Sequence, residues 1–155
     1  MKYSIFLIFT IISFSTVSCE NNTNEILTGN VFIKLVDLGS LYKASREDVY
    51  SMKEKVDNFK QSNSNESEKL LYNYYKVLFD NNLADKPYCL IKDERGKIRR
   101  VFFSLENYRE VERLLPGLDK NKEQINLSLK VVKVNEDIYI TNKIIYIRKD
   151  KREKF

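Results

Sequence analysis

The chain has 155 residues, of which 43% are hydrophobic and 32% are charged, and its formal net charge is +5. This composition is that of a globular protein rather than a disordered one, and the length suits one domain with its own core. The sequence contains no histidine, which removes the commonest general base, the Ser–His and Cys–His nucleophile pairs and ordinary zinc sites.

Residues 1–19 have the organisation of an export signal. A positively charged start is followed by the apolar run 4–14 and the small residues 15–18, directly before Cys19. An apolar run of this length spans only about 16 Å as a helix, about half of the hydrocarbon core of a bilayer. We therefore predict that residues 1–18 form a signal peptide and not a permanent transmembrane helix.

Val17, Ser18 and Cys19, directly after the apolar run, resemble the lipobox of the bacterial lipoproteins. The resemblance covers residues 1–19 alone, and this chain has Thr16 where the family usually has Leu. It implies that the signal is cut before Cys19 and that Cys19 carries fatty acids such as palmitate. Two or three acyl chains hold a protein at a membrane where one would not. The alternative is ordinary signal-peptidase cleavage with a soluble product.

The fate of Cys19 decides what Cys89 can do, because the chain has two cysteines. Acylation of Cys19 leaves Cys89 without an intramolecular partner, whereas a free Cys19 in an oxidising compartment would allow a disulfide between the two. Cys89 lies in a predicted strand, which favours a buried, inert thiol over a reactive one.

The segment 19–28 is polar and lacks periodicity, so we predict that it is the lipidated N-terminus and a flexible tether. A tether of this kind spans roughly 15–18 Å, which keeps the folded domain near the bilayer. We expect a single domain over residues 29–148 and a basic C-terminal tail over residues 149–155. The tail is interpreted as a solvated terminus, with contact to anionic headgroups as the alternative.

Three helices are predicted. The first begins at the N-cap Ser45, the second at Asn65 or Ser67, and the third at Ser104. The second helix carries a broad apolar stripe, which we assign to the core; a tyrosine ligand platform is the alternative. The residues of this stripe are Leu70, Leu71, Tyr74, Tyr75, Leu78 and Phe79.

The strands follow from β-branched and alternating apolar residues. Gly96 is expected to close a hairpin with a positive φ. A change of phase after Val131 predicts a β-bulge, and Asn142 marks an interruption of the last strand. The predicted strands cover residues 30–38, 88–92, 97–103, 125–134 and 138–147.

These elements indicate an α+β fold. We expect an antiparallel sheet of about five strands with two to three helices packed on one face. A small, partly closed β-barrel with added helices is the alternative.

The sequence offers no motif for catalysis or for binding a cofactor or metal. Its four glycines lie far apart at turns, without the spacing of a phosphate-binding loop. The stretch from Asp119 begins like a calcium loop, but Gln124 occupies the obligatory glycine position and Lys130 the twelfth position. We therefore predict no catalytic, cofactor or metal residues, and Cys19 as the lipidated residue.

The sequence thus predicts a non-catalytic lipoprotein of the bacterial cell envelope. It would be a protein-binding or accessory module, held at the inner or outer membrane by acyl chains on Cys19, with an envelope protein as partner. Nucleic acid is not expected for an exported protein of this charge. An immunity or inhibitor lipoprotein against a toxin or hydrolase is the alternative.

Two further alternatives come from other functional classes. A carboxylate-dependent hydrolase would need a cleft in which two acidic side chains converge and one of them has a raised pKa. A small-ligand carrier would need an apolar pocket between the sheet and its helices.

Overall fold

The computed structural model describes residues 24–31, 41–60, 64–115 and 123–151. The predicted signal peptide, Cys19, most of the first predicted strand and the end of the predicted tail lie outside these ranges. No helix within them is both long and apolar enough to cross a bilayer.

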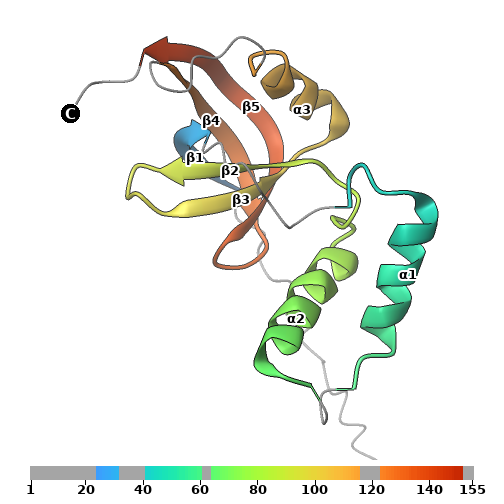
Figure 1. Ribbon diagram of the computed structural model, residues 1–155. Coiled ribbons are helices and arrows are strands. Elements are labelled where there is room, and N and C mark those ends of the chain that lie inside the picture. The colour runs from blue at the N-terminus through green and yellow to red at the C-terminus, as the bar shows by residue number, and fades with distance from the viewer. Residues whose placement is uncertain (1–23, 32–40, 61–63, 116–122, 152–155) are drawn as a thin grey trace, which may run out of the picture.

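Five strands form a closed barrel in the order β1-β2-β3-β5-β4 (Figure 1). All neighbouring strands are antiparallel except β3 and β5, which are parallel. The strands are β1 (Asn24–Val31), β2 (Tyr88–Asp93), β3 (Ile98–Phe102), β4 (Glu123–Lys133) and β5 (Ile138–Lys151). The helices are α1 (Arg46–Asp57) and α2 (Glu66–Asp80), between β1 and β2, and α3 (Leu105–Glu112), between β3 and β4.

The α+β class and the small barrel that we gave as the alternative are confirmed. The open antiparallel sheet that we preferred is wrong, because β1 pairs with β2 along one edge and with β4 along the other. The long β5 completes the closure by pairing with β4 and, in parallel, with β3. This strand order, with a helix between β3 and β4, is that of the OB fold, a five-stranded Greek-key barrel.

The inside of the barrel is apolar. Alternate residues of β4 point inward and are fully buried, as their spacing in the sequence predicts. The helix α3 closes one end of the barrel with Val111, against which Leu114 and Leu115 also pack. The buried β-strand residues of this core are Val31, Cys89, Ile91, Val101, Ile125, Leu127, Leu129, Val131 and Tyr139.

All three helices begin at the predicted kind of residue. Ser45 and Asn65 cap α1 and α2, and each forms a capping box with the acidic residue three positions later. Ser104 caps α3. The predicted caps are confirmed, with Asn65 rather than Ser67 as the cap of α2.

Two glycines are required by the barrel. Gly96 has a φ of +78° in the β2–β3 turn, as predicted, and its N–H donates to the Asp93 carbonyl at 2.9 Å. At Gly29, β1 lies so close to β2 that a Cβ would be 2.3 Å from the carbonyl oxygen of Lys92.

The barrel includes more of the chain than the sequence predicts. Residues 24–28 were assigned to the tether, but β1 begins at Asn24 and pairs with β4 from Asn24 to Asn30. Residues 149–151 were assigned to the basic tail, but β5 continues through Lys151. Both expectations are wrong because polar residues on the outer face of a barrel strand resemble a loop in sequence.

A β-bulge lies beside Val131, as predicted, but its extra residue belongs to β5 and not to β4. The register of β4 against β5 slips by one residue at two places, and each time the extra residue belongs to β5, at Asn142 and at Ile145. Bulges bend a strand and increase its twist, which lets β5 turn from β4 toward β3.

Candidate functional site

The α1–α2 hairpin lies beside the barrel and contacts it through the C-terminal half of α2 (Figure 1). Leu78 is fully buried in an apolar cluster with Phe102 of β3 and Ile138 of β5. Tyr74 and Tyr75 pack against the same cluster. The assignment of the apolar stripe of α2 to the core is therefore confirmed for this half of the helix.

The N-terminal half of α2 contradicts that assignment. Leu70 is 67% exposed and Leu71 is 53% exposed, and Tyr50 on α1 is 72% exposed. This half of α2 projects beyond the barrel, and among the helices and strands that the structure describes it has α1 beside it (Figure 1). Periodicity predicts which side of a helix is apolar, but not whether another element covers that side.

An apolar groove of about 360 Å³ lies between α1 and α2. Phe59 and Tyr72 form one part of it, with stacked rings whose centroids are 4.3 Å apart. The other apolar and aromatic residues that line it are Met52, Val56, Leu71 and Tyr75. We call this feature the hairpin groove.

Arg100 of β3 helps to hold α2 against the barrel. Its guanidinium carbon lies 4.7 Å from the ring centroid of Tyr74 on α2 and 5.4 Å from that of Tyr88 on β2. Cation–π contacts of this kind stabilise the joint between helix and strand. In OB folds the β2–β3 face and its neighbouring loops bind ligands, and here α2 covers part of that face.

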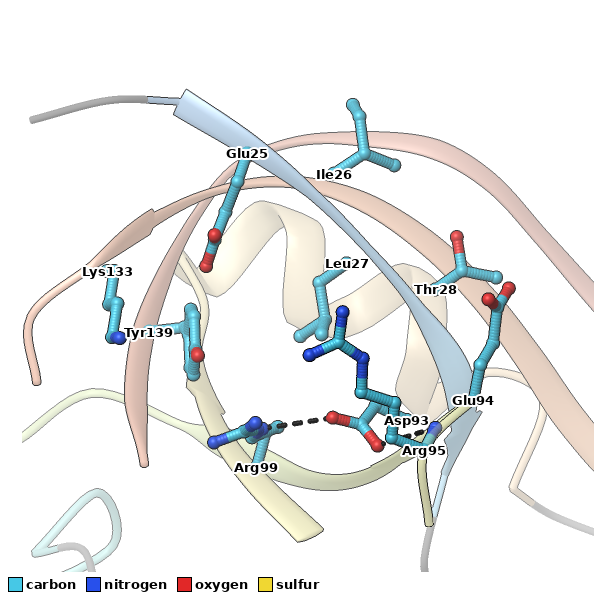
Figure 2. A pocket seen from close by; sticks show the side chains of 10 residues that line it. All are labelled: Glu25, Ile26, Leu27, Thr28, Asp93, Glu94, Arg95, Arg99, Lys133 and Tyr139. Carbon is cyan, nitrogen blue, oxygen red and sulfur yellow. Dashed lines mark hydrogen bonds and ion pairs between the residues drawn. The ribbon is translucent and has the colours of Figure 1, made fainter. Parts of the chain in front are cut away.

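A second cavity, of about 390 Å³, opens at the end of the barrel opposite α3 (Figure 2). It lies at the start of β3 and the end of β4, whereas α3 follows the end of β3 and precedes the start of β4. We call it the barrel mouth, and Leu27 forms part of its apolar floor. Its charged and aromatic lining consists of Glu25, Asp93, Glu94, Arg95, Arg99, Lys133 and Tyr139.

Asp93 and Arg99 form a largely buried ion pair at the barrel mouth. Asp93 Oδ2 accepts a hydrogen bond from Arg99 Nε at 3.1 Å, and the two side chains are 11% and 14% exposed. Asp93 Oδ1 accepts from the backbone amides of Arg95 at 3.0 Å and Lys97 at 2.8 Å. Burial acts to raise the pKa of Asp93, but these hydrogen bonds and the guanidinium outweigh it, so the pKa lies below its usual range.

The guanidinium of Arg99 joins three segments of the mouth. Besides Asp93, its Nη1 donates to the Glu136 carbonyl and to Asp137 Oδ1 at 3.4 Å in the β4–β5 turn. The guanidinium carbon also lies 5.7 Å from the ring centroid of Tyr139. Because Nε and Nη1 are engaged in this way, Arg99 holds these segments of the mouth together.

Four other charged side chains at the mouth have no such partners. Within the part of the chain that the structure describes, the side chains of Glu25, Glu94, Arg95 and Lys133 make no hydrogen bond or ion pair. Figure 2 shows the guanidinium of Arg95 reaching over the opening, with Glu25 and Lys133 on the same side of it. The mouth therefore offers a ligand both signs of charge.

The buried position predicted for Cys89 is confirmed. Its side chain lies in the barrel core, 8% exposed, and burial raises the pKa of the thiol to about 12. Cys89 is therefore protonated at neutral pH, and the thiol rather than the reactive thiolate is present. Cys19, the predicted lipidation site, lies outside the described residues.

Among the described residues, no three Cys, Asp or Glu side chains gather as metal ligands. The hydrolase alternative requires a carboxyl group with a raised pKa, but the Asp93 carboxylate is paired with Arg99 and its pKa is lowered. The carrier alternative requires an apolar pocket between the sheet and its helices, whereas the barrel mouth has a largely charged lining and the apolar hairpin groove lies between two helices.

Sequence reasoning missed both cavities. The barrel mouth collects residues from all five strands and from the β2–β3 turn, and no local pattern relates them. For the hairpin groove the sequence contains one indication, the tyrosines of α2, for which a ligand platform was the alternative. Two of them, Tyr72 and Tyr75, line the groove.

No family model, curated protein or solved structure matches the chain. A proposal for its function therefore rests on the two cavities and on the N-terminal sequence.

Proposed function

We propose that this protein is a non-catalytic lipoprotein of the bacterial cell envelope that binds another protein through the hairpin groove. The observation that carries the proposal is the hairpin groove itself, whose lining is mostly apolar and includes Leu71, which is 53% exposed. Large apolar side chains grouped on a surface are typical of protein–protein interaction sites. The barrel also exposes single apolar side chains, among them Ile26 (62%), Ile145 (50%) and Ile98 (44%), so the apolar groove, and not exposure alone, distinguishes the hairpin.

The shape of the groove suits a helical segment of a partner. The lining of the groove runs from Met52 to Phe59 and from Glu68 to Tyr75, so the groove is about 11 Å long, the length of about two turns of a helix. The stacked rings of Phe59 and Tyr72 give it a flat aromatic wall. An amphipathic helix binds such a groove by placing apolar residues at helical spacing into it.

Anchoring rests on the lipobox-type sequence that ends at Cys19. Acylation there would hold the hairpin groove at the membrane surface, where the partner would be another envelope protein. If that partner is a toxin or a hydrolase, the chain is an immunity or inhibitor lipoprotein. The identity of the captured protein distinguishes this alternative from an accessory role.

The test is capture of partners by the full-length lipoprotein from its native membrane, with two matched variants. Leu71→Glu places a charge in the hairpin groove, and Ile98→Glu places the same charge on the barrel, where Ile98 is 44% exposed. We expect Leu71→Glu to lose the partner and Ile98→Glu to keep it. Loss from both variants, or capture no different from that by an unrelated lipoprotein, would contradict the proposal.

The anchor is tested separately by the intact mass of the mature protein. We expect a chain that begins at Cys19 and carries the mass of two or three fatty acids. The variant Cys19→Ala should lack this mass and leave the membrane. An unmodified wild-type chain would refute the lipoprotein assignment.

A further inference from the structure

β1 connects the barrel mouth directly to the proposed anchor. Its first residue, Asn24, precedes the mouth residue Glu25, and Asn24 Oδ1 accepts a hydrogen bond from Asn142 Nδ2 of β5 at 2.6 Å. Only residues 20–23 lie between Cys19 and Asn24 in the sequence. Even fully extended, that length of chain spans at most about 18 Å.

This short connection determines which end of the barrel is near the bilayer. The end closed by α3 lies further away by the length of the barrel, and β4 alone extends roughly 35 Å along its own axis. A lipid on Cys19 therefore holds the barrel mouth, and not α3, at the height of the lipid headgroups.

The unpaired charges of the mouth match a headgroup that carries both signs. Arg95 and Lys133 are cations suited to the oxygens of a phosphate, and the carboxylate of Glu25 is suited to an ammonium group. The buried pair of Asp93 and Arg99 is neutral as a unit and fixes the turn that carries Arg95. The volume of about 390 Å³ is within the range of small-ligand sites.

We propose that the barrel mouth faces the bilayer and binds the headgroup of an amine-bearing phospholipid, with its phosphate on Arg95 and Lys133 and its ammonium on Glu25. This inference rests on the proposed acylation of Cys19. A primary ammonium donates three hydrogen bonds, whereas the trimethylammonium of phosphatidylcholine donates none. Phosphatidylethanolamine should therefore be preferred over phosphatidylcholine.

The orientation is tested with the full-length acylated protein in vesicles whose headgroups carry a fluorescence quencher. A fluorophore is attached through Lys97→Cys, in the turn beside the mouth, or through Glu110→Cys, on α3; both positions are exposed. Cys89 is buried and does not compete for the label. We expect strong quenching at position 97 and weak quenching at position 110, and the reverse order would overturn the proposal.

The headgroup is tested by native mass spectrometry of the acylated protein released from vesicles of mixed phosphatidylethanolamine and phosphatidylcholine. We expect wild type to retain phosphatidylethanolamine, and the double variant Arg95→Ala/Lys133→Ala to lose about tenfold or more in retention of either lipid. The matched double variant Arg109→Ala/Lys151→Ala, with the same change of charge at the other end of the barrel, should behave as wild type.

Selectivity is tested with one carboxylate at the mouth and one at the other end of the barrel. Glu25→Gln should abolish the preference for phosphatidylethanolamine over phosphatidylcholine, whereas Glu110→Gln, on the exposed side of α3, should preserve it. Equal retention of both lipids by wild type would overturn the assignment of the ammonium to Glu25. Binding of free phosphoethanolamine at the mouth, without quenching at position 97, would identify a soluble ligand and overturn the lipid proposal.

The failure of this inference is distinguishable from failure of the proposed function. An unmodified Cys19 in the intact mass would remove the anchor and both proposals that depend on it. An acylated Cys19 with unquenched label at position 97 would leave the lipoprotein assignment in place and refute only the orientation of the mouth.

Discussion

Gly29 and Cys89 are both buried by the closure of the barrel, and each has a consequence that can be measured. Gly29 faces the β2 backbone so closely that any Cβ would contact Lys92 and Ile91. Cys89 is a neutral thiol because the barrel core gives its charged form no solvation. In both cases a neighbouring strand determines the property of the residue.

We predict that Gly29→Ala destabilises the protein by about 1–3 kcal/mol, because β1 and β2 must move apart to admit the methyl group. Gly96→Ala is the matched control. It introduces the same methyl group at a φ of +78° but with no atom closer than 3.9 Å, so its cost is the backbone strain of about 1–2 kcal/mol. Urea unfolding measures both, and a larger loss for Gly96→Ala would contradict the close approach at Gly29.

We predict that Cys89 makes the protein less stable at alkaline pH. The folded pKa of about 12 lies above the ordinary value of 9.0, so between these values the unfolded thiol loses its proton while the folded thiol keeps it. Below pH 9 the group has no effect, and above it the free energy of unfolding should fall by about 1.4 kcal/mol per pH unit.

The measurement is urea unfolding of wild type and Cys89→Ala between pH 8 and 10.5. Other titrating groups are common to both proteins, so the difference between the two curves isolates Cys89. We expect the curves to converge as the pH rises. Parallel curves would show that the thiol ionises equally in the folded and unfolded states.

At the scale of elements, α2 has two halves with different roles. Its C-terminal half packs on the barrel through Leu78 and the Tyr74–Arg100–Tyr88 contact, and its N-terminal half forms the hairpin groove with α1. The docked half fixes the position of the exposed half. A partner that fills the groove is therefore held in a defined orientation to the barrel.

We predict that Arg100→Met loosens the hairpin while leaving the barrel folded. The methionine keeps an unbranched apolar stem but loses the cation–π contacts with Tyr74 and Tyr88, at a cost of about 1–2 kcal/mol. Amide hydrogen exchange should become faster in α1 and α2 and stay unchanged in β4. Arg109→Met, on α3, is the control, and equal effects of the two variants would refute the role of Arg100.

In the whole molecule, the barrel carries the proposed lipid contact and the hairpin carries the proposed protein contact. The barrel mouth lies at the end where β1 begins and the proposed tether enters, and the hairpin groove lies on a projection beside the barrel (Figure 1). Because α2 covers part of the β2–β3 face, this OB-type barrel has its cavities elsewhere. The arrangement allows a lipid and a protein to be bound at the same time.

Local chemistry in the sequence determined the helix caps and the turn at Gly96, and it also predicts the export signal. Ser45, Asn65 and Ser104 could be predicted because a cap depends on a few neighbouring residues, and the alternation in β4 because burial repeats with the pleat. The buried Cys89 followed from the same local pattern.

The tertiary structure alone decided the closure of the sheet, the exposure of Leu70 and Leu71, and the barrel mouth. Closure depends on β5 pairing in parallel with β3, a contact between strands 38 residues apart at Arg100 and Ile138. The exposure of Leu70 and Leu71 depends on which element lies beside α2. The barrel mouth depends on five strands that meet only when the barrel closes. Such properties arise from contacts between distant residues, and a local pattern carries no information about them.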